Sequence, residues 1–66
     1  MRNPYEVLGV QANASVEEIK AAYRRRAKET HPDLHGGSQE YASRFCEVTD
    51  AYAILSDPVA RSRFDQ

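Results

Sequence analysis

The sequence predicts an all-α fold of two long antiparallel helices, about residues 16–30 and 39–55, with a short helix at each end. In both long segments apolar residues recur at steps of three and four, the period of an amphipathic helix. No segment alternates apolar and polar residues in the manner of a β-strand. A chain of 66 residues is long enough for one small domain with a marginal core.

The first short helix is expected between Asn3 and Gly9. Asn3 is a favourable N-cap residue, and Pro4 suits the first position of a helix. Gly9 is a favourable stop, because glycine adopts the left-handed conformation that commonly ends a helix. Tyr5 and Leu8 lie three residues apart, so we expect both side chains on the buried face.

The first long helix is expected to begin at a capping box, in which Ser15 is the N-cap and Glu18 reaches back to it. Ile19 lies on its apolar stripe. Arg26 and Thr30 fall on the same stripe, where apolar residues would be expected. We expect Arg26 to lay its methylene groups over the edge of the core and to extend its guanidinium group into water.

The second long helix has an apolar stripe over four turns, and Ser38 is expected to cap its start. The last short helix is expected to begin at Asp57, with Pro58 in its first position, and to return Phe64 to the core. The predicted core consists of Tyr5, Leu8, Ile19, Phe45, Val48, Tyr52, Leu55 and Phe64.

Composition favours a globular domain of the cytoplasm. Hydrophobic residues make up 41% of the chain and charged residues 29%, with a net charge of −1. The single cysteine cannot form an intrachain disulfide, so nothing points to an oxidising compartment. The sequence shows neither the apolar core of a signal peptide nor an apolar run that would span a membrane.

The segment between the two long helices is the candidate functional site. Pro32 fixes its own φ angle and moves His31 out of the helical region, so the first long helix is expected to end there. Asp33 follows this rigid corner, and Gly36 and Gly37 release the chain into the next helix. A loop that is stiff at one end and lies at the tip of a helical hairpin is typical of a functional segment.

The residues near this loop do not form a recognisable catalytic or metal-binding pattern. A metal site could draw on His31, Asp33, His35 and Cys46, but their spacing matches no zinc motif. Cys46 is expected to be a small, partly buried thiol inside a helix. A domain this small also lacks the concavity of a typical active site. We therefore expect no catalytic residue, cofactor or metal.

Charge is distributed unevenly, because residues 15–30 carry five basic and three acidic side chains, whereas residues 31–66 carry three basic and six acidic ones. The basic face of the first long helix consists of Lys20, Arg24, Arg25 and Lys28. This face could be a solvated surface with pairs such as Glu17–Lys20 or Arg24–Glu29. It could instead bind a phosphate backbone, or dock on an acidic protein surface.

The chain resembles a known family over nearly its whole length. The matching segments are Pro4-Tyr5-x-x-Leu8-Gly9-Val10, Ile19-Lys20-x-Ala22-Tyr23-Arg24-x-x-Ala27, His31-Pro32-Asp33, Phe45-x-x-Val48-x-x-Ala51-Tyr52-x-x-Leu55-Ser56-Asp57 and Arg61-x-x-Phe64-Asp65. In this order and spacing they resemble a J-domain, the module of the DnaJ (heat shock protein 40) co-chaperones. The resemblance implies that residues 1–66 form one J-domain, the N-terminal part of a longer protein.

The resemblance also implies a function by contact, in which the domain binds a heat shock protein 70 (DnaK-type) chaperone and stimulates its ATP hydrolysis for client folding. The implied trigger loop is His31, Pro32 and Asp33. The implied docking face on the helix before it is Lys20, Tyr23, Arg24 and Arg25. The domain is then expected to be monomeric, to bind neither nucleic acid nor a membrane, and not to be an enzyme itself.

Three residues depart from the family pattern. Arg26 stands where the family usually has leucine, and Thr30 replaces a common aromatic residue. Leu34 replaces a basic residue that often follows the aspartate, and it could fold back over Thr30. Two alternatives remain open beside the co-chaperone hypothesis. One is a J-like tethering module that has lost ATPase stimulation, and the other is a small nucleic-acid-binding helical bundle.

Overall fold

The computed structural model describes residues 3–66 and contains four α-helices and one 3₁₀ turn. The helices are α1 (Pro4–Leu8), α2 (Val16–Thr30), α3 (Gln39–Ser56) and α4 (Pro58–Asp65), and the turn η1 (Pro32–His35) joins α2 to α3. No β-strand occurs within residues 3–66. The all-α prediction is therefore confirmed, and each long helix begins at the residue expected from the sequence.

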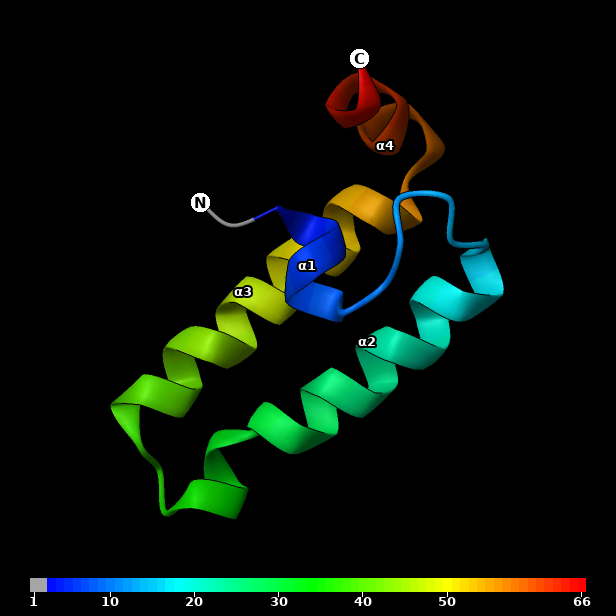
Figure 1. Ribbon diagram of the computed structural model, residues 1–66. Helices are drawn as coiled ribbons and strands as arrows, with labels where there is room; N and C mark the ends of the chain where they lie inside the picture. The colour runs from blue at the N-terminus through cyan, green and yellow to red at the C-terminus, as the bar shows by residue number, and fades with distance from the viewer. Residues whose placement is uncertain (1–2) are drawn as a thin grey trace.

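The helices form an elongated hairpin of about 38 × 22 × 16 Å. The long helices α2 and α3 run antiparallel, and α1 packs across them (Figure 1). The α4 helix lies at the end of the hairpin where α3 finishes, and η1 lies at the opposite end (Figure 1). This arrangement places the candidate functional loop at the end of the hairpin away from α4.

Local hydrogen bonds fix α1 at both ends, as the sequence predicts. The Asn3 side chain accepts a hydrogen bond from the Tyr5 N–H at 2.9 Å. Gly9 adopts the left-handed conformation with φ = 72°, and its N–H donates to the Glu6 carbonyl oxygen at 3.1 Å. These two caps limit α1 to five residues, which places Tyr5 and Leu8 on the core face.

The predicted capping box at the start of α2 is present. The Glu18 N–H donates to the Ser15 hydroxyl oxygen at 3.2 Å, and the Ser15 N–H donates to the Glu18 carboxylate at 3.3 Å. Ala14, just before the cap, and Ile19, just after it, are both buried in the core. The start of α2 is therefore fixed by polar and apolar contacts together.

The two later helix starts differ from each other. The Asp57 carboxylate accepts a hydrogen bond from the Val59 N–H at 3.0 Å, as expected for the N-cap of α4. Ser38 occupies the N-cap position of α3 but makes no side-chain capping bond, so that prediction is wrong. The Ser38 carbonyl oxygen accepts from the Ala42 N–H at 3.0 Å. The start of α3 therefore depends on backbone hydrogen bonding and packing.

The core lies where α1 crosses the hairpin. Its buried members are Tyr5, Leu8, Ala14, Ile19, Ala22, Val48, Ala51 and Leu55. The predicted residues Phe45 and Tyr52 are only partly buried. Phe64 is 42% exposed, so the expectation that it returns to the core is wrong. Its ring lies 6.0 Å from the Tyr5 ring. The side chain stays exposed because α4 packs against the end of the hairpin rather than over it.

A network centred on Arg61 attaches α4 to the start of the chain. The Arg61 Nε donates to the Tyr5 hydroxyl at 3.0 Å, and its Nη2 donates to the carbonyl oxygens of Ala14 at 2.7 Å and Ala12 at 3.2 Å. The Tyr5 hydroxyl in turn donates to the Asp65 carboxylate at 2.8 Å. Polar contacts thus supply much of what holds α4 in place.

Candidate partner-binding surface

The loop between α2 and α3 is a short, well-defined turn. His31 has the extended backbone conformation (φ = −61°, ψ = 127°) that a following proline favours, and α2 ends there. Pro32 then occupies the first position of η1, and Gly36 ends η1 in the left-handed conformation with φ = 64°. The predicted rigid corner is therefore present at the tip of the hairpin (Figure 1).

His31 supports the backbone of the turn. Its Nδ1 accepts a hydrogen bond from the Asp33 N–H at 3.2 Å, which leaves the ring proton of the neutral form on Nε2. The His31 ring also meets the Phe45 ring of α3 edge to face, with the centroids 5.4 Å apart. Its position is thus fixed by both η1 and α3.

Asp33 is the most prominent charged group of the tip. Its side chain is 90% exposed, and the nearby His31 Nδ1 lies 3.8 Å from its Oδ2. The His31 ring is held by the Asp33 N–H and by Phe45. At 3.8 Å it leaves the Asp33 carboxylate open to solvent. A fixed backbone carrying a solvated carboxylate is suited to form a charge-assisted hydrogen bond with a cation of a partner.

A second histidine holds the other side of the turn. The His35 ring stacks on the Tyr41 ring with centroids 3.5 Å apart, and its Nε2 lies 2.8 Å from the Glu29 carbonyl oxygen. The Arg44 guanidinium group lies 5.1 Å from the centre of the Tyr41 ring and forms an ion pair with Glu40 at 2.8 Å. Sequence reasoning considered His35 only as a metal ligand and missed this supporting role.

The docking face that the family resemblance implies on α2 combines exposed and partly buried residues. Lys20, Arg24 and Arg25 are exposed and extend along one side of the helix. Tyr23 is partly buried, and its ring stacks on the Tyr52 ring of α3 with centroids 4.1 Å apart. Tyr23 therefore joins α2 to α3, whereas the three cations remain accessible to a partner.

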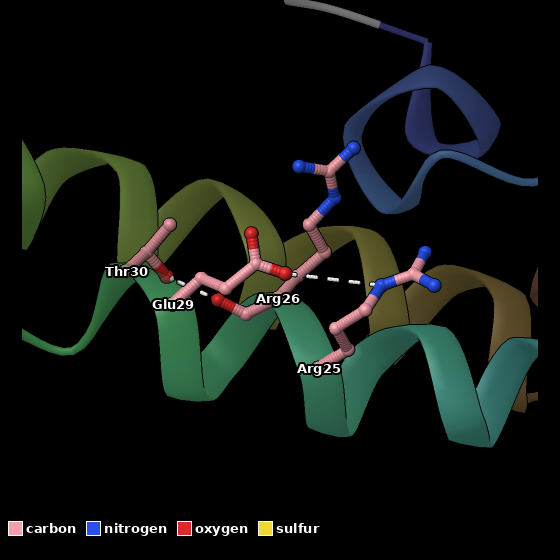
Figure 2. A network of polar contacts seen from close by, with 4 residues as sticks. All are labelled: Arg25, Arg26, Glu29 and Thr30. Atoms are coloured by element: carbon pink, nitrogen blue, oxygen red, sulfur yellow. Dashed lines mark hydrogen bonds and ion pairs between the residues drawn. The ribbon is translucent and has the colours of Figure 1, made fainter.

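The ion pair found on this face joins Arg25 to Glu29 rather than Arg24 to Glu29. The Arg25 Nε lies 3.8 Å from a Glu29 carboxylate oxygen (Figure 2). Both side chains are more than half exposed, and an exposed pair of this spacing contributes only about 0.3–0.5 kcal/mol. Arg25 can therefore exchange Glu29 for an acidic group of a partner at little cost.

The prediction that the Arg26 guanidinium group extends into water is not met at its Nε. The side chain points away from Arg25 toward α1 (Figure 2). Its Nε is buried and has no hydrogen-bond partner among residues 3–66. The Nη2 lies so close to Gly9 that a Cβ atom there would approach it to 2.8 Å. The physical reason is crowding, because α1 covers this part of α2.

Thr30, the last residue of α2, turns its hydroxyl inward along the helix. The hydroxyl donates to the Arg26 carbonyl oxygen at 2.7 Å (Figure 2). Thr30 and Arg26 border a hollow of about 240 Å³, together with residues of α1 and α3. Leu34 does not cover Thr30, since it is 63% exposed, so the idea that it folds back is wrong.

The two remaining expectations concern Cys46 and metal binding. Cys46 is exposed on α3, which corrects the prediction of a partly buried thiol. Among residues 3–66, no group of three histidine, cysteine or acidic side chains is placed to hold a metal ion. No helix in the described part of the chain is long and apolar enough to cross a membrane.

Comparisons with known proteins agree with this geometry. The family model described as DnaJ domain matches residues 3–65. "Chaperone protein DnaJ" of Caldicellulosiruptor saccharolyticus is 53% identical over 62 residues, which cover 94% of this chain and 16% of that protein. "Chaperone protein DnaJ" of Tropheryma whipplei is 54% identical over 66 residues, which cover 100% of this chain and 18% of that protein.

A solved structure shares the fold. The solution structure of the J-domain from human DnaJ subfamily C member 12 superposes with a TM-score of 0.84 at 35% sequence identity. The match covers 94% of this chain and 55% of that chain. The chain thus spans less than a fifth of the two bacterial relatives and more than half of the human domain.

Proposed function

This chain belongs to the DnaJ domain family, and we propose that it binds a heat shock protein 70 (DnaK-type) chaperone and stimulates its ATP hydrolysis. Members of this family are co-chaperones and are not themselves enzymes. In this proposal the domain acts by binding, and the partner catalyses the hydrolysis. Coupling to client folding follows from the partner's ATPase cycle.

One observation supports this proposal most strongly: the tip presents the Asp33 carboxylate 90% exposed on a backbone held from both sides. A fixed carboxylate can reach a defined cation on the partner without a large loss of conformational freedom. We propose that His31, Pro32 and Asp33 form the trigger loop, with Asp33 as the group that contacts the partner's ATPase.

The docking face of this proposal is Lys20, Arg24 and Arg25. These exposed cations are suited to steer the encounter with an acidic surface and to set its orientation. Tyr23, which was assigned to the same face from the family resemblance, packs on Tyr52 instead. We propose that Tyr23 contributes indirectly, by holding α2 at its distance from α3.

The test is single-turnover ATP hydrolysis by a DnaK-type chaperone, measured with and without this domain. We expect the wild-type domain to accelerate hydrolysis and Asp33→Asn to abolish the acceleration. The neutral amide of asparagine cannot form the charge-assisted hydrogen bond with the partner's cation through which the loop is proposed to act on the ATPase. No acceleration by the wild-type domain, or equal acceleration by Asp33→Asn, would refute the proposal.

The same experiment distinguishes the tethering alternative. Binding to the chaperone without a change in hydrolysis would identify a module that has kept docking and lost stimulation. A steep dependence of duplex DNA affinity on salt would favour the nucleic-acid alternative. We also propose a cytoplasmic location and a monomeric domain. In this proposal residues 1–66 are one J-domain of a longer protein.

A further inference from the structure

Leu34 is unusual among the large apolar side chains of this domain. It is 63% exposed, the largest value among the large hydrophobic residues of the described chain. Phe64 is also exposed, but its ring packs near Tyr5. Leu34 lies in η1 directly after Asp33, at the end of the hairpin far from α4 (Figure 1).

The backbone that carries Leu34 is held on both sides. Its own N–H donates to the His31 carbonyl oxygen at 3.1 Å. The Pro32 carbonyl oxygen accepts from the Gly37 N–H at 2.8 Å and also from the Gly36 N–H. On the far side, His35 is fixed by its stacking on an aromatic ring of α3. The tip therefore presents Leu34 from a turn that has little backbone freedom to lose on binding.

Asp33 and Leu34 project from this turn in different directions. Successive side chains of a 3₁₀ turn are about one third of a turn apart, and consecutive Cα atoms are about 3.8 Å apart. With 90% of the Asp33 side chain and 63% of Leu34 exposed, both can touch one surface at neighbouring points. Single exposed apolar residues are common on protein surfaces. Leu34 differs because it is rigidly held beside the proposed trigger.

We propose that Leu34 is a second contact residue of the trigger tip, and that it enters an apolar recess next to the cation that receives Asp33. This inference rests on the proposed function, since the partner surface is that of the DnaK-type chaperone. Asp33 supplies the charged contact that changes the partner's ATPase. Leu34 supplies apolar burial, which lowers the rate of dissociation and does not alter the hydrolysis step.

The test measures single-turnover hydrolysis by a DnaK-type chaperone over a range of domain concentrations, and compares Leu34→Ala with wild type. We expect the half-saturating concentration to rise about 5- to 10-fold, the loss expected when about half of the leucine side chain beyond Cβ is buried by the partner, while the rate at saturation stays unchanged. Leu34→Met should restore the half-saturating concentration, because methionine has a similar volume and apolar character.

The matched control is Val59→Ala, since Val59 is 58% exposed and lies on α4 at the other end of the molecule. It should leave the half-saturating concentration unchanged. Three results would overturn the role of Leu34 and leave the proposed function intact. They are an unchanged half-saturating concentration for Leu34→Ala, an equal rise for Val59→Ala, and a failure of Leu34→Met to restore it. No acceleration by the wild-type domain would overturn this inference together with the proposed function.

Discussion

At the scale of single residues, Arg26 places an unsatisfied polar atom inside the domain. Its Nε is buried without a hydrogen-bond partner in the described chain, beside the glycine that ends α1. A buried donor that lacks a partner costs about 1–3 kcal/mol of stability. The family usually has leucine here, and a leucine would fill the same space between α1 and α2 without that cost.

Arg26→Leu should therefore raise the free energy of unfolding by about 1–2 kcal/mol, because it removes the unsatisfied donor and keeps the apolar volume. Urea denaturation followed by circular dichroism measures the change. Arg24→Leu is the matched control, since Arg24 is exposed on the same helix, and it should change stability by less than about 0.5 kcal/mol. A loss of stability in Arg26→Leu would show that the guanidinium group is a net stabilising contact.

The glycine that faces Arg26 offers a second test. Gly9→Ala should lower the free energy of unfolding by roughly 1–2 kcal/mol, the cost of a left-handed conformation for an alanine, since the end of the Arg26 side chain can move away from the added Cβ. Gly36→Ala is the control, since Gly36 has a similar φ of +64° but open space around it. Urea denaturation should give similar losses for the two variants, and a much larger loss for Gly9→Ala would show that the Arg26 side chain cannot move away from Gly9.

At the scale of elements, the four helices are held by different means. The hairpin of α2 and α3 is joined by apolar packing and by the stacked rings of Tyr23 and Tyr52. The α4 helix buries few large side chains, and Arg61 connects it to α1 and to the segment before α2. Its attachment should therefore be more sensitive to the loss of polar contacts than that of the other helices.

Arg61→Met keeps much of the side-chain volume but removes three donated hydrogen bonds, and should lower the free energy of unfolding by about 2 kcal/mol. Amide hydrogen exchange should show faster exchange in α4 than in α2 or α3. Arg63→Met, an exposed arginine of the same helix, is the control and should change neither quantity appreciably. Uniform loss of protection across all helices would contradict a local role for Arg61.

At the scale of the whole molecule, the hairpin separates two ends with different tasks. One end carries α4, and the other carries η1 with its exposed carboxylate (Figure 1). The exposed cations of α2 lie between them. In the proposed function these cations attract and orient the partner, and the tip alone changes its activity.

The division of tasks predicts a distinct effect of charge on the α2 face. Arg24→Glu should raise the half-saturating concentration for hydrolysis by a DnaK-type chaperone about 10-fold, because it replaces attraction by repulsion, and the rise should be smaller at high salt. Arg63→Glu makes the same charge change on α4 and is the control. An equal effect of the two variants would show that net charge matters and the α2 face does not.

Sequence reasoning predicted the features that depend on nearby residues. The helix starts at Asn3, Ser15 and Asp57 could be predicted because each side chain bonds to the backbone within three residues. The corner at Pro32 could be predicted because the proline ring fixes the backbone. Phe64 was predicted less well, because helical periodicity says which face is apolar but not whether another element covers it.

The packing between elements accounts for the other differences. The direction taken by Arg26 depends on α1 crossing α2, and the His35 contact depends on Tyr41 arriving from α3. Neither partner is close enough in sequence to be assigned by spacing alone. The turn that carries the candidate site could therefore be predicted from the sequence, while the contacts that support it required the three-dimensional arrangement.

The most direct test of the central claim compares two parameters of the same hydrolysis curve for Asp33→Asn and Arg24→Glu. Asp33→Asn should fold as stably as wild type in urea, since its side chain is 90% exposed. It should lose acceleration even at saturating domain, whereas Arg24→Glu should reach the wild-type rate at higher concentration. Recovery of the full rate by Asp33→Asn at high concentration would contradict the claim that this carboxylate is the trigger.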